Sequence, residues 1–134
     1  MNMKNMEMNL RTTEKVLSPG EKICQLANQF GFIENHACIK IRTNIENAPE
    51  TLDEEIGKWF DSAQEIVNNL GNGDVFEKAS IGMTLISATM YLRADLLEDA
   101  DNAFYDAVDC AQGRGFYDLK DQIVAIAREV GVDI

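Results

Sequence analysis

The chain has 134 residues and a net charge of −11 at pH 7, and 46% of its residues are apolar. This length indicates one domain, and this apolar content is ordinary for a globular protein. The sequence lacks a run of about 18 apolar residues, so we expect no membrane-spanning segment. The three cysteines (Cys24, Cys38 and Cys110) form no C-x-x-C pair, which argues against a disulfide framework or a zinc site and favours a cytoplasmic location.

The negative charge is concentrated in the C-terminal two-thirds of the chain. Residues 1–50 contain six basic and six acidic residues, whereas residues 51–134 contain six basic and 17 acidic residues. Direct binding to nucleic acid or to an anionic membrane requires a basic surface, so both partners are disfavoured. The charge favours a protein partner with a basic or amphipathic surface, although an acidic surface can also serve solubility alone.

Residues 1–15 precede the first helical pattern and are predicted to form a disordered N-terminal arm. Four of the six methionines lie in this segment, where polar residues separate them. Residues 16–134 are predicted to form a single all-helical domain.

The sequence SPGE at residues 18–21 predicts the start of the first helix. Ser18 is suited to the N-cap and Pro19 to the first helical position, and Glu21 is placed to bond back to the cap. Apolar residues then recur at helical spacing until Gly31, which predicts the end of this helix.

Residues 34–46 fit two patterns. Ile39 and Ile41 alternate with basic residues, as in a strand, whereas apolar residues spaced by four indicate a helix. A single strand would have no partner, so we predict a helix here.

Four further helices are predicted from stripes of apolar residues. Each stripe follows a hydroxyl or acidic residue suited to the N-cap, with an acidic residue three positions later. The expected caps are Thr51, Asp74, Asp95 and Asp118. The helix over residues 75–93 is apolar on much of its circumference, so we expect it to lie centrally. The whole pattern predicts an all-α fold of about six helices in antiparallel pairs.

Residues 81–111 resemble a tetratricopeptide repeat, a helix–turn–helix unit of about 34 residues with small and aromatic residues at fixed offsets. The residues that match this pattern are Ala88, Tyr91, Ala100, Phe104 and Ala107. The sequence departs from the pattern at Thr84, Ser87 and Gln112. The resemblance implies a stack of helical hairpins that binds a peptide or a partner protein and does no chemistry. The other fold that we consider is an unrelated compact helical bundle, because alanines occur wherever helices pack closely.

The candidate binding surface is an acidic face of the predicted helix that follows Asp95. Its residues are Asp99, Asn102, Tyr105, Asp106 and Asp109. Tyr105 falls outside the apolar stripe of this helix, and an exposed tyrosine beside acidic residues is a plausible contact for a partner. The alternative is a solvated helix face without a partner.

We predict no catalytic residue, no metal site and no cofactor. The single histidine, His36, stands two residues from Glu34, so the two side chains point in different directions on a helix. One alternative rests on Glu98 and Asp101, an E-x-x-D motif that could bind Mg²⁺ together with acidic residues of the helix over residues 51–70. In helical content and in this motif the chain resembles all-helical nucleoside triphosphate pyrophosphohydrolases, but it lacks the matching E-x-x-E.

The sequence therefore favours a non-enzymatic protein–protein interaction module, such as an adaptor, a regulator or a small inhibitor. Its acidic helical surface would bind a basic partner. Two alternatives stay open: the metal-dependent pyrophosphohydrolase, and a structural homo-oligomer that shares apolar helix faces between subunits.

Overall fold

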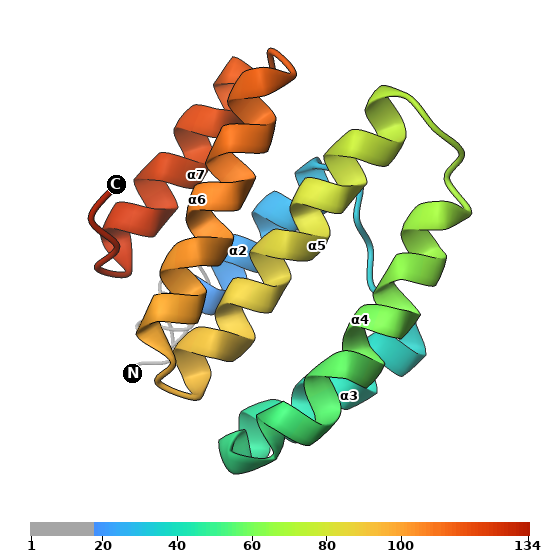
Figure 1. Cartoon of the computed structure of the whole chain (residues 1–134), viewed down its shortest axis with the longest axis vertical. Coiled ribbons are helices and arrows are strands. Elements are labelled where there is room, and N and C mark those ends of the chain that lie inside the picture. The colour runs from blue at the N-terminus through green and yellow to red at the C-terminus, as the bar shows by residue number, and fades with distance from the viewer. Residues whose placement is uncertain (1–17) are drawn as a thin grey trace, which may run out of the picture.

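The computed structural model describes residues 18–134, and Figure 1 shows that this part of the chain is helical. Its elements are α2 (Pro19–Gln29), α3 (His36–Asn47), η1 (Pro49–Thr51, a 3-10 turn), α4 (Leu52–Asn68), α5 (Asp74–Arg93), α6 (Leu97–Gly113) and α7 (Tyr117–Glu129). The predicted all-α class with six helices is confirmed, and the described residues include no strand. The arm predicted for residues 1–15 lies outside the described residues. No helix within residues 18–134 is long and apolar enough to cross a membrane.

Helix α5 occupies the centre of the fold. It contacts α2, α3, α4 and α6, and the further pairs α3–α4 and α6–α7 also pack together. Figure 1 shows α5 between α4 and α6, with α2 behind α5 and α6 and with α3 behind α4. Nine residues of α5 are buried, so the predicted central position of this helix is confirmed.

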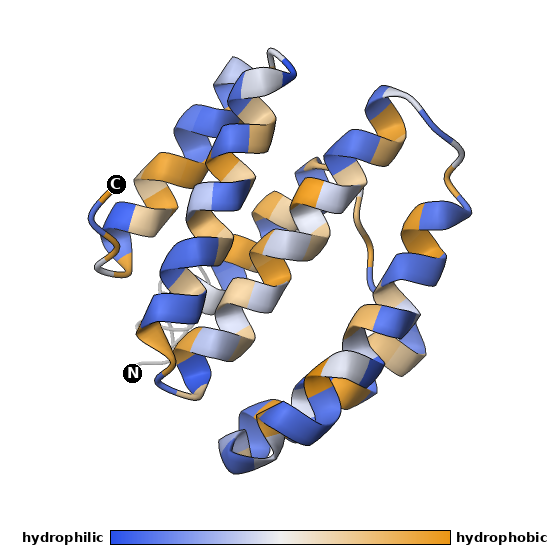
Figure 2. Ribbon diagram, in the orientation of Figure 1, coloured by the Kyte–Doolittle hydropathy of each residue, from blue (hydrophilic) through white to orange (hydrophobic). Residues whose placement is uncertain are grey.

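One apolar core lies among α2, α5, α6 and α7, and we call it the α6–α7 core. Its buried members are Ile23, Leu26, Phe30, Ile81, Leu85, Ala88, Ala103, Phe104, Ala107, Val108, Ala111, Ile123, Ala127 and Val132. Helix α6 contributes mainly alanines to this core, and small side chains let neighbouring helices approach closely. Figure 2 shows apolar and polar residues alternating around each ribbon, as expected for helices with one buried face.

A second apolar core lies among α2, α3, α4 and α5, and we call it the α3–α4 core. Its buried members are Ala27, Phe32, Cys38, Ile45, Leu52, Trp59, Ala63, Val67, Ala79, Ile86 and Met90. Trp59 is completely buried and packs edge-on against Phe32 and Phe60, with ring centroids 6.1 Å and 5.3 Å away. This core therefore depends on large aromatic side chains that come from separate segments.

The capping box predicted at the start of α2 is confirmed. The backbone N–H of Glu21 donates to Oγ of Ser18 at 3.2 Å, and the backbone N–H of Ser18 donates to Oε1 of Glu21 at 2.8 Å. The hydrogen bonds lower the pKa of the Glu21 carboxyl, because they stabilise its charged form.

Of the other four predicted caps, Thr51 does occupy the N-cap position of α4 but makes no capping bond, and those at Asp74, Asp95 and Asp118 are wrong. The Thr51 hydroxyl donates instead to the carbonyl of Ala48 at 2.8 Å. Helix α5 begins at Asp74 itself, after Gly73. Asp95 lies in the left-handed region with φ 62°, within the α5–α6 turn, and Asp118 is already the second residue of α7.

The last two turns explain why acidic residues do not cap there. The N-cap residues are Leu96 and Phe116, and the N–H of each bonds to a carbonyl five residues earlier, at 2.9 Å in both cases. This bond is the one that closes a Schellman motif at the end of the preceding helix. The same residue thus ends one helix and starts the next, and the tight turn fixes the helix start.

Candidate functional site

The structure brings the five predicted binding residues together on one exposed face of α6. All five (Asp99, Asn102, Tyr105, Asp106 and Asp109) are exposed, whereas Ala100, Phe104 and Ala107 on the opposite face are buried. The intervals of three and four residues keep the acidic side chains on the same side of the helix.

The carboxylates of this face have no basic partner within the described part of the chain. The segment between Arg93 and Arg114 contains six acidic residues and no basic one. Among residues 18–134, no ion pair joins a lysine or arginine to Asp99, Asp106 or Asp109. Arg114, which follows the end of α6, pairs instead with Glu77 of α5 at 2.9 Å. Within residues 18–134, no ion pair therefore compensates the negative charge of this face.

Tyr105 has a structural contact that the sequence did not indicate. Its hydroxyl donates a hydrogen bond to the backbone carbonyl of Asp133, although 43% of the residue is exposed. The chain turns back toward α6 after α7, and Val132 in this segment is buried. Tyr105 therefore ties the C-terminal segment to α6, while its ring stays partly exposed.

Two groups near the acidic residues of α6 have raised pKa values. Burial raises the pKa of the Tyr91 hydroxyl on α5, and the carboxylates of Asp99 on α6 and Asp53 on α4 raise it further. Burial also raises the pKa of the Cys110 thiol, followed by the effects of Asp106 and of Glu77 on α5. Acidic side chains of α4, α5 and α6 thus disfavour ionisation of these two groups.

The acidic residues of the alternative metal site are not gathered around a common point. Glu98 and Asp101 lie in the first turns of α6, and the other proposed acidic ligands belong to α4. Within residues 18–134, no group of three or more His, Cys, Asp or Glu side chains is arranged to hold a metal ion.

Sequence reasoning missed a buried polar network around Glu34, in the loop between α2 and α3. Arg42 donates from Nη2 to Oε1 of Glu34 at 2.8 Å and from Nε to both carboxylate oxygens at 3.0 Å. Trp59 donates from Nε1 to Oε2 of Glu34 at 2.9 Å. Only 7% of the Glu34 side chain and 18% of the Arg42 side chain are exposed.

The network joins α3, α4 and the loop that precedes α3. Arg42 also pairs with Glu46 at 2.9 Å, an i,i+4 contact that its spacing could have indicated. The contact of Glu34 with Trp59 spans 25 residues and has no local signal. The hydrogen bonds to the Glu34 carboxylate raise the pKa of the Arg42 guanidinium, so Arg42 stays charged.

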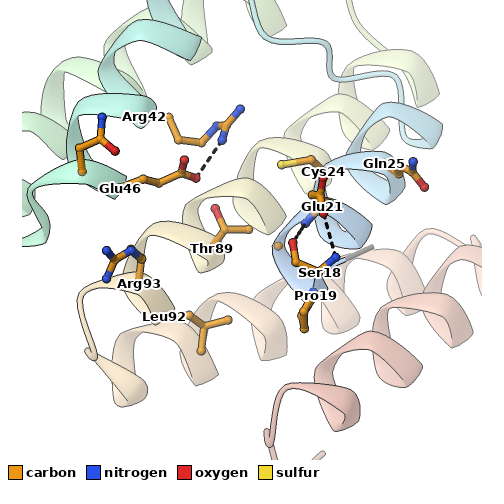
Figure 3. A pocket seen from close by; sticks show the side chains of 12 residues that line it. Ser18, Pro19, Glu21, Cys24, Gln25, Arg42, Glu46, Thr89, Leu92 and Arg93 are labelled. Carbon is orange, nitrogen blue, oxygen red and sulfur yellow. Dashed lines mark hydrogen bonds and ion pairs between the residues drawn. The ribbon is translucent and has the colours of Figure 1, made fainter. Parts of the chain in front are cut away.

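An open groove lies between α2, α3 and α5, with a volume of about 870 Å³. Figure 3 shows its lining side chains, which include Glu21, Cys24, Arg42, Glu46, Leu92 and Arg93. Burial raises the pKa of the Cys24 thiol, so this side chain is protonated at neutral pH. Because the three helices meet only after folding, nothing in the sequence pattern indicated this groove.

Comparison with protein-family models, with curated proteins and with solved structures gives no match to this chain.

Proposed function

We propose that this protein is a non-enzymatic protein–protein interaction module whose acidic α6 face binds a partner with a basic surface. The observation that carries this proposal is the exposed row of Asp99, Asp106 and Asp109, which have no basic partner among residues 18–134. An adaptor, a regulator or a small inhibitor would each use such a surface in this way.

Electrostatics supports this class of function. Like charges held on one rigid helix repel one another, and a cationic partner relieves that repulsion. Complementary charge also accelerates encounter between two proteins and makes the association rate sensitive to salt. The alanine-rich packing of α6 holds the backbone under these carboxylates in place, so little ordering is required on binding.

The resemblance of residues 81–111 to a tetratricopeptide repeat supports the same class, because such helical stacks bind peptides or proteins. The matching residues Ala88, Phe104 and Ala107 belong to one buried core. At two departures from the pattern, the hydroxyls of Thr84 and Ser87 bond to carbonyls of their own helix, so these polar residues fit on the packed helix α5.

The test compares two triple variants that remove the same number of charges. The first, Asp99→Asn, Asp106→Asn and Asp109→Asn, neutralises the α6 face. The control, Glu54→Gln, Asp61→Asn and Glu65→Gln, neutralises exposed acidic residues of α4. The wild-type chain is used to isolate its partner from the native cell, and the affinity of that partner is then measured for all three chains by calorimetry.

We expect the α6 variant to lose about tenfold in affinity and the α4 control to lose less, since three exposed charge contacts together contribute about 1.4 kcal/mol. The affinity of the wild-type chain should also fall as salt concentration rises. Equal effects of both variants, or an affinity that salt does not change, would refute the proposal. Light scattering of the same samples tests the homo-oligomer alternative, which requires self-association.

A further inference from the structure

The hairpin formed by α3 and α4 is joined to the neighbouring helices at one end. The two helices pack together and run in opposite directions, so the start of α3 at His36 and the end of α4 at Asn68 lie at the same end. Figure 1 shows that the connections to α2 and to α5 both leave from this end. At its other end, which we call the tip, the hairpin turns through η1.

The groove between α2, α3 and α5 lies beside the tip. Its lining includes Glu46 and Asn47 at the end of α3, and Leu92 and Arg93 at the end of α5. The hairpin is therefore attached near the start of α5, and an open space of about 870 Å³ borders it near the end of α5.

Within the described part of the chain, apolar packing is what joins the hairpin to the other helices. Among residues 18–134, no ion pair and no hydrogen bond joins residues 34–68 to α2, α5, α6 or α7. By contrast, Lys22 of α2 pairs with Glu129 of α7 at 2.7 Å. Apolar contacts lack the strict geometry of hydrogen bonds, so a small rotation of the hairpin breaks no directional contact.

The hairpin itself is firmly held together. Glu34 accepts hydrogen bonds from Arg42 of α3 at 2.8 Å and from Trp59 of α4 at 2.9 Å. Buried apolar residues of α3 and α4, among them Ile45 and Ala63, belong to the same core. These contacts favour movement of α3 and α4 as one body.

Both connections contain residues suited to a pivot. Ile33, between the buried Phe32 and the network at Glu34, is 67% exposed. Gly71 and Gly73 are exposed, and they have φ angles of 91° and 83°. Nothing lies within 4 Å of a Cβ built at either glycine. A hinge usually consists of a few such loop residues, which absorb the change in backbone angles.

We propose that the α3–α4 hairpin pivots as one body at Ile33 and at residues 69–73, and that this motion widens and narrows the groove. Helix α5 is roughly 30 Å long, so a rotation of about 10° moves the tip by about 5 Å. Glu46 and Arg93 carry opposite charges on facing walls of the groove (Figure 3), and their attraction favours the narrow state. This proposal does not depend on the function proposed for α6.

Distances between spin labels in the full chain test this motion. Four exposed positions are used: His36 and Glu50 on the hairpin, and Val75 and Glu98 at the two ends of the neighbouring helices α5 and α6. They are replaced by cysteine in pairs, in a chain whose three native cysteines are replaced by alanine. Double electron–electron resonance then gives the distribution of distances for each pair.

The Glu50–Glu98 pair spans the groove at the tip. We expect its distribution to be at least about twice as wide as those of the controls, because displacement grows with distance from the pivot. The controls are His36–Val75 beside the pivot, His36–Glu50 within the hairpin, and Val75–Glu98 outside it. A distribution at the tip as narrow as the controls would overturn the proposal. So would equal broadening of His36–Glu50, since the hairpin would then unfold rather than pivot.

The charges on the groove walls give a second test with the same labels. In Arg93→Gln, the mean Glu50–Glu98 distance should increase, because the attraction to Glu46 is lost. Arg114→Gln removes the same charge outside the groove and should leave this distance unchanged. An unchanged distance in Arg93→Gln, or an equal change in both variants, would contradict the proposed narrow state.

The chain with its native cysteines is tested by nuclear magnetic resonance relaxation dispersion, which detects motion between microseconds and milliseconds. The backbone amides of Asn47 and Leu92, on the two walls of the groove, should exchange between two environments at one common rate. Amides of α7 should show no such exchange. Unrelated rates at the two walls, or no exchange at either wall, would argue against a single pivoting body.

Discussion

The two cores of this protein are built in different ways. The α6–α7 core consists of aliphatic side chains, many alanines and the two phenylalanines Phe30 and Phe104. The α3–α4 core contains Phe32 and Trp59, and it is bordered by the ion pair of Glu34 and Arg42. The first core depends on close approach of helix backbones, and the second on a few large or charged side chains that meet from separate segments.

This difference concentrates the sensitivity to mutation in the α3–α4 core. Each small side chain of the α6–α7 core contributes only a small part of the packing energy, because packing contacts are individually weak. Trp59 combines a large buried ring with a hydrogen bond to Glu34, so one residue supports both the packing and the polar network. Substitutions can therefore test whether the two cores differ in the way that their compositions suggest.

The largest effect is expected for Trp59→Ala. Loss of the ring should lower the free energy of unfolding by about 5 kcal/mol, the upper end for an aromatic residue in a core. Phe104→Ala in the α6–α7 core should cost about 3 kcal/mol, because no polar group loses a partner there. Urea unfolding followed by circular dichroism at the helix band measures both. Equal costs would remove the proposed contrast between the cores.

Next in size is Glu34→Gln, which keeps the shape of the side chain but removes its charge. We expect a loss of about 3 kcal/mol, because the largely buried Arg42 then loses its main counter-charge. The control is Glu46→Gln, which removes the second partner of Arg42. The Glu46 side chain is 39% exposed, so its loss should cost less than about 1 kcal/mol. Similar costs for the two variants would show that the burial of Glu34 contributes little.

Two glycine-to-alanine substitutions should change the free energy of unfolding in opposite directions. A Cβ added at Gly82 of α5 would lie 2.8 Å from Cβ of Phe32 and 2.9 Å from the carbonyl oxygen of Ala27. Gly82→Ala should therefore cost about 2 kcal/mol, since the segment between α2 and α3 would have to shift. At Gly57 of α4 nothing lies within 4 Å, so Gly57→Ala should stabilise by about 0.5–1 kcal/mol. Thermal unfolding should show a lower melting temperature for Gly82→Ala and a higher one for Gly57→Ala. A stabilised Gly82→Ala variant would contradict the close contact.

A smaller effect is expected at the start of α2. Ser18→Ala removes the capping bond and should cost about 1 kcal/mol. Thr51→Ala should cost less, because Thr51 makes no capping bond to α4. Chemical unfolding compares the two, and a larger cost at Thr51 would be inconsistent with the observed caps.

The smallest expected effect concerns the metal-dependent alternative. A thermal-shift scan with millimolar Mg²⁺ or Mn²⁺ and nucleoside triphosphates should leave the melting temperature unchanged. A ligand that binds only the native state must raise stability, by about 2.7 kcal/mol at a hundred times its dissociation constant. A clear rise with metal and nucleotide together would favour the enzyme over the interaction module.

Much of the fold could be predicted because helices are encoded by local patterns. Apolar residues at helical spacing indicated all six helices, including the ambiguous segment at residues 34–46. The exposure of Asp99, Asp106 and Asp109 followed from the same periodicity, since they lie opposite the apolar stripe of α6. The cap patterns predicted the helix starts less well. Leu96 and Phe116, and not the expected acidic residues, precede α6 and α7, because tight turns fix where these helices begin.

The sequence by itself determined the helices, their apolar faces and the acidic row on α6, because each depends on residues within a few turns of one another. Only the tertiary structure decided which side chains meet across longer distances. The pairing of Glu34 with Trp59, the bond of Tyr105 to Asp133 and the groove beside Cys24 all join segments far apart in the chain. Periodicity fixes the face on which a residue lies, but the packing of helices decides what that face contacts.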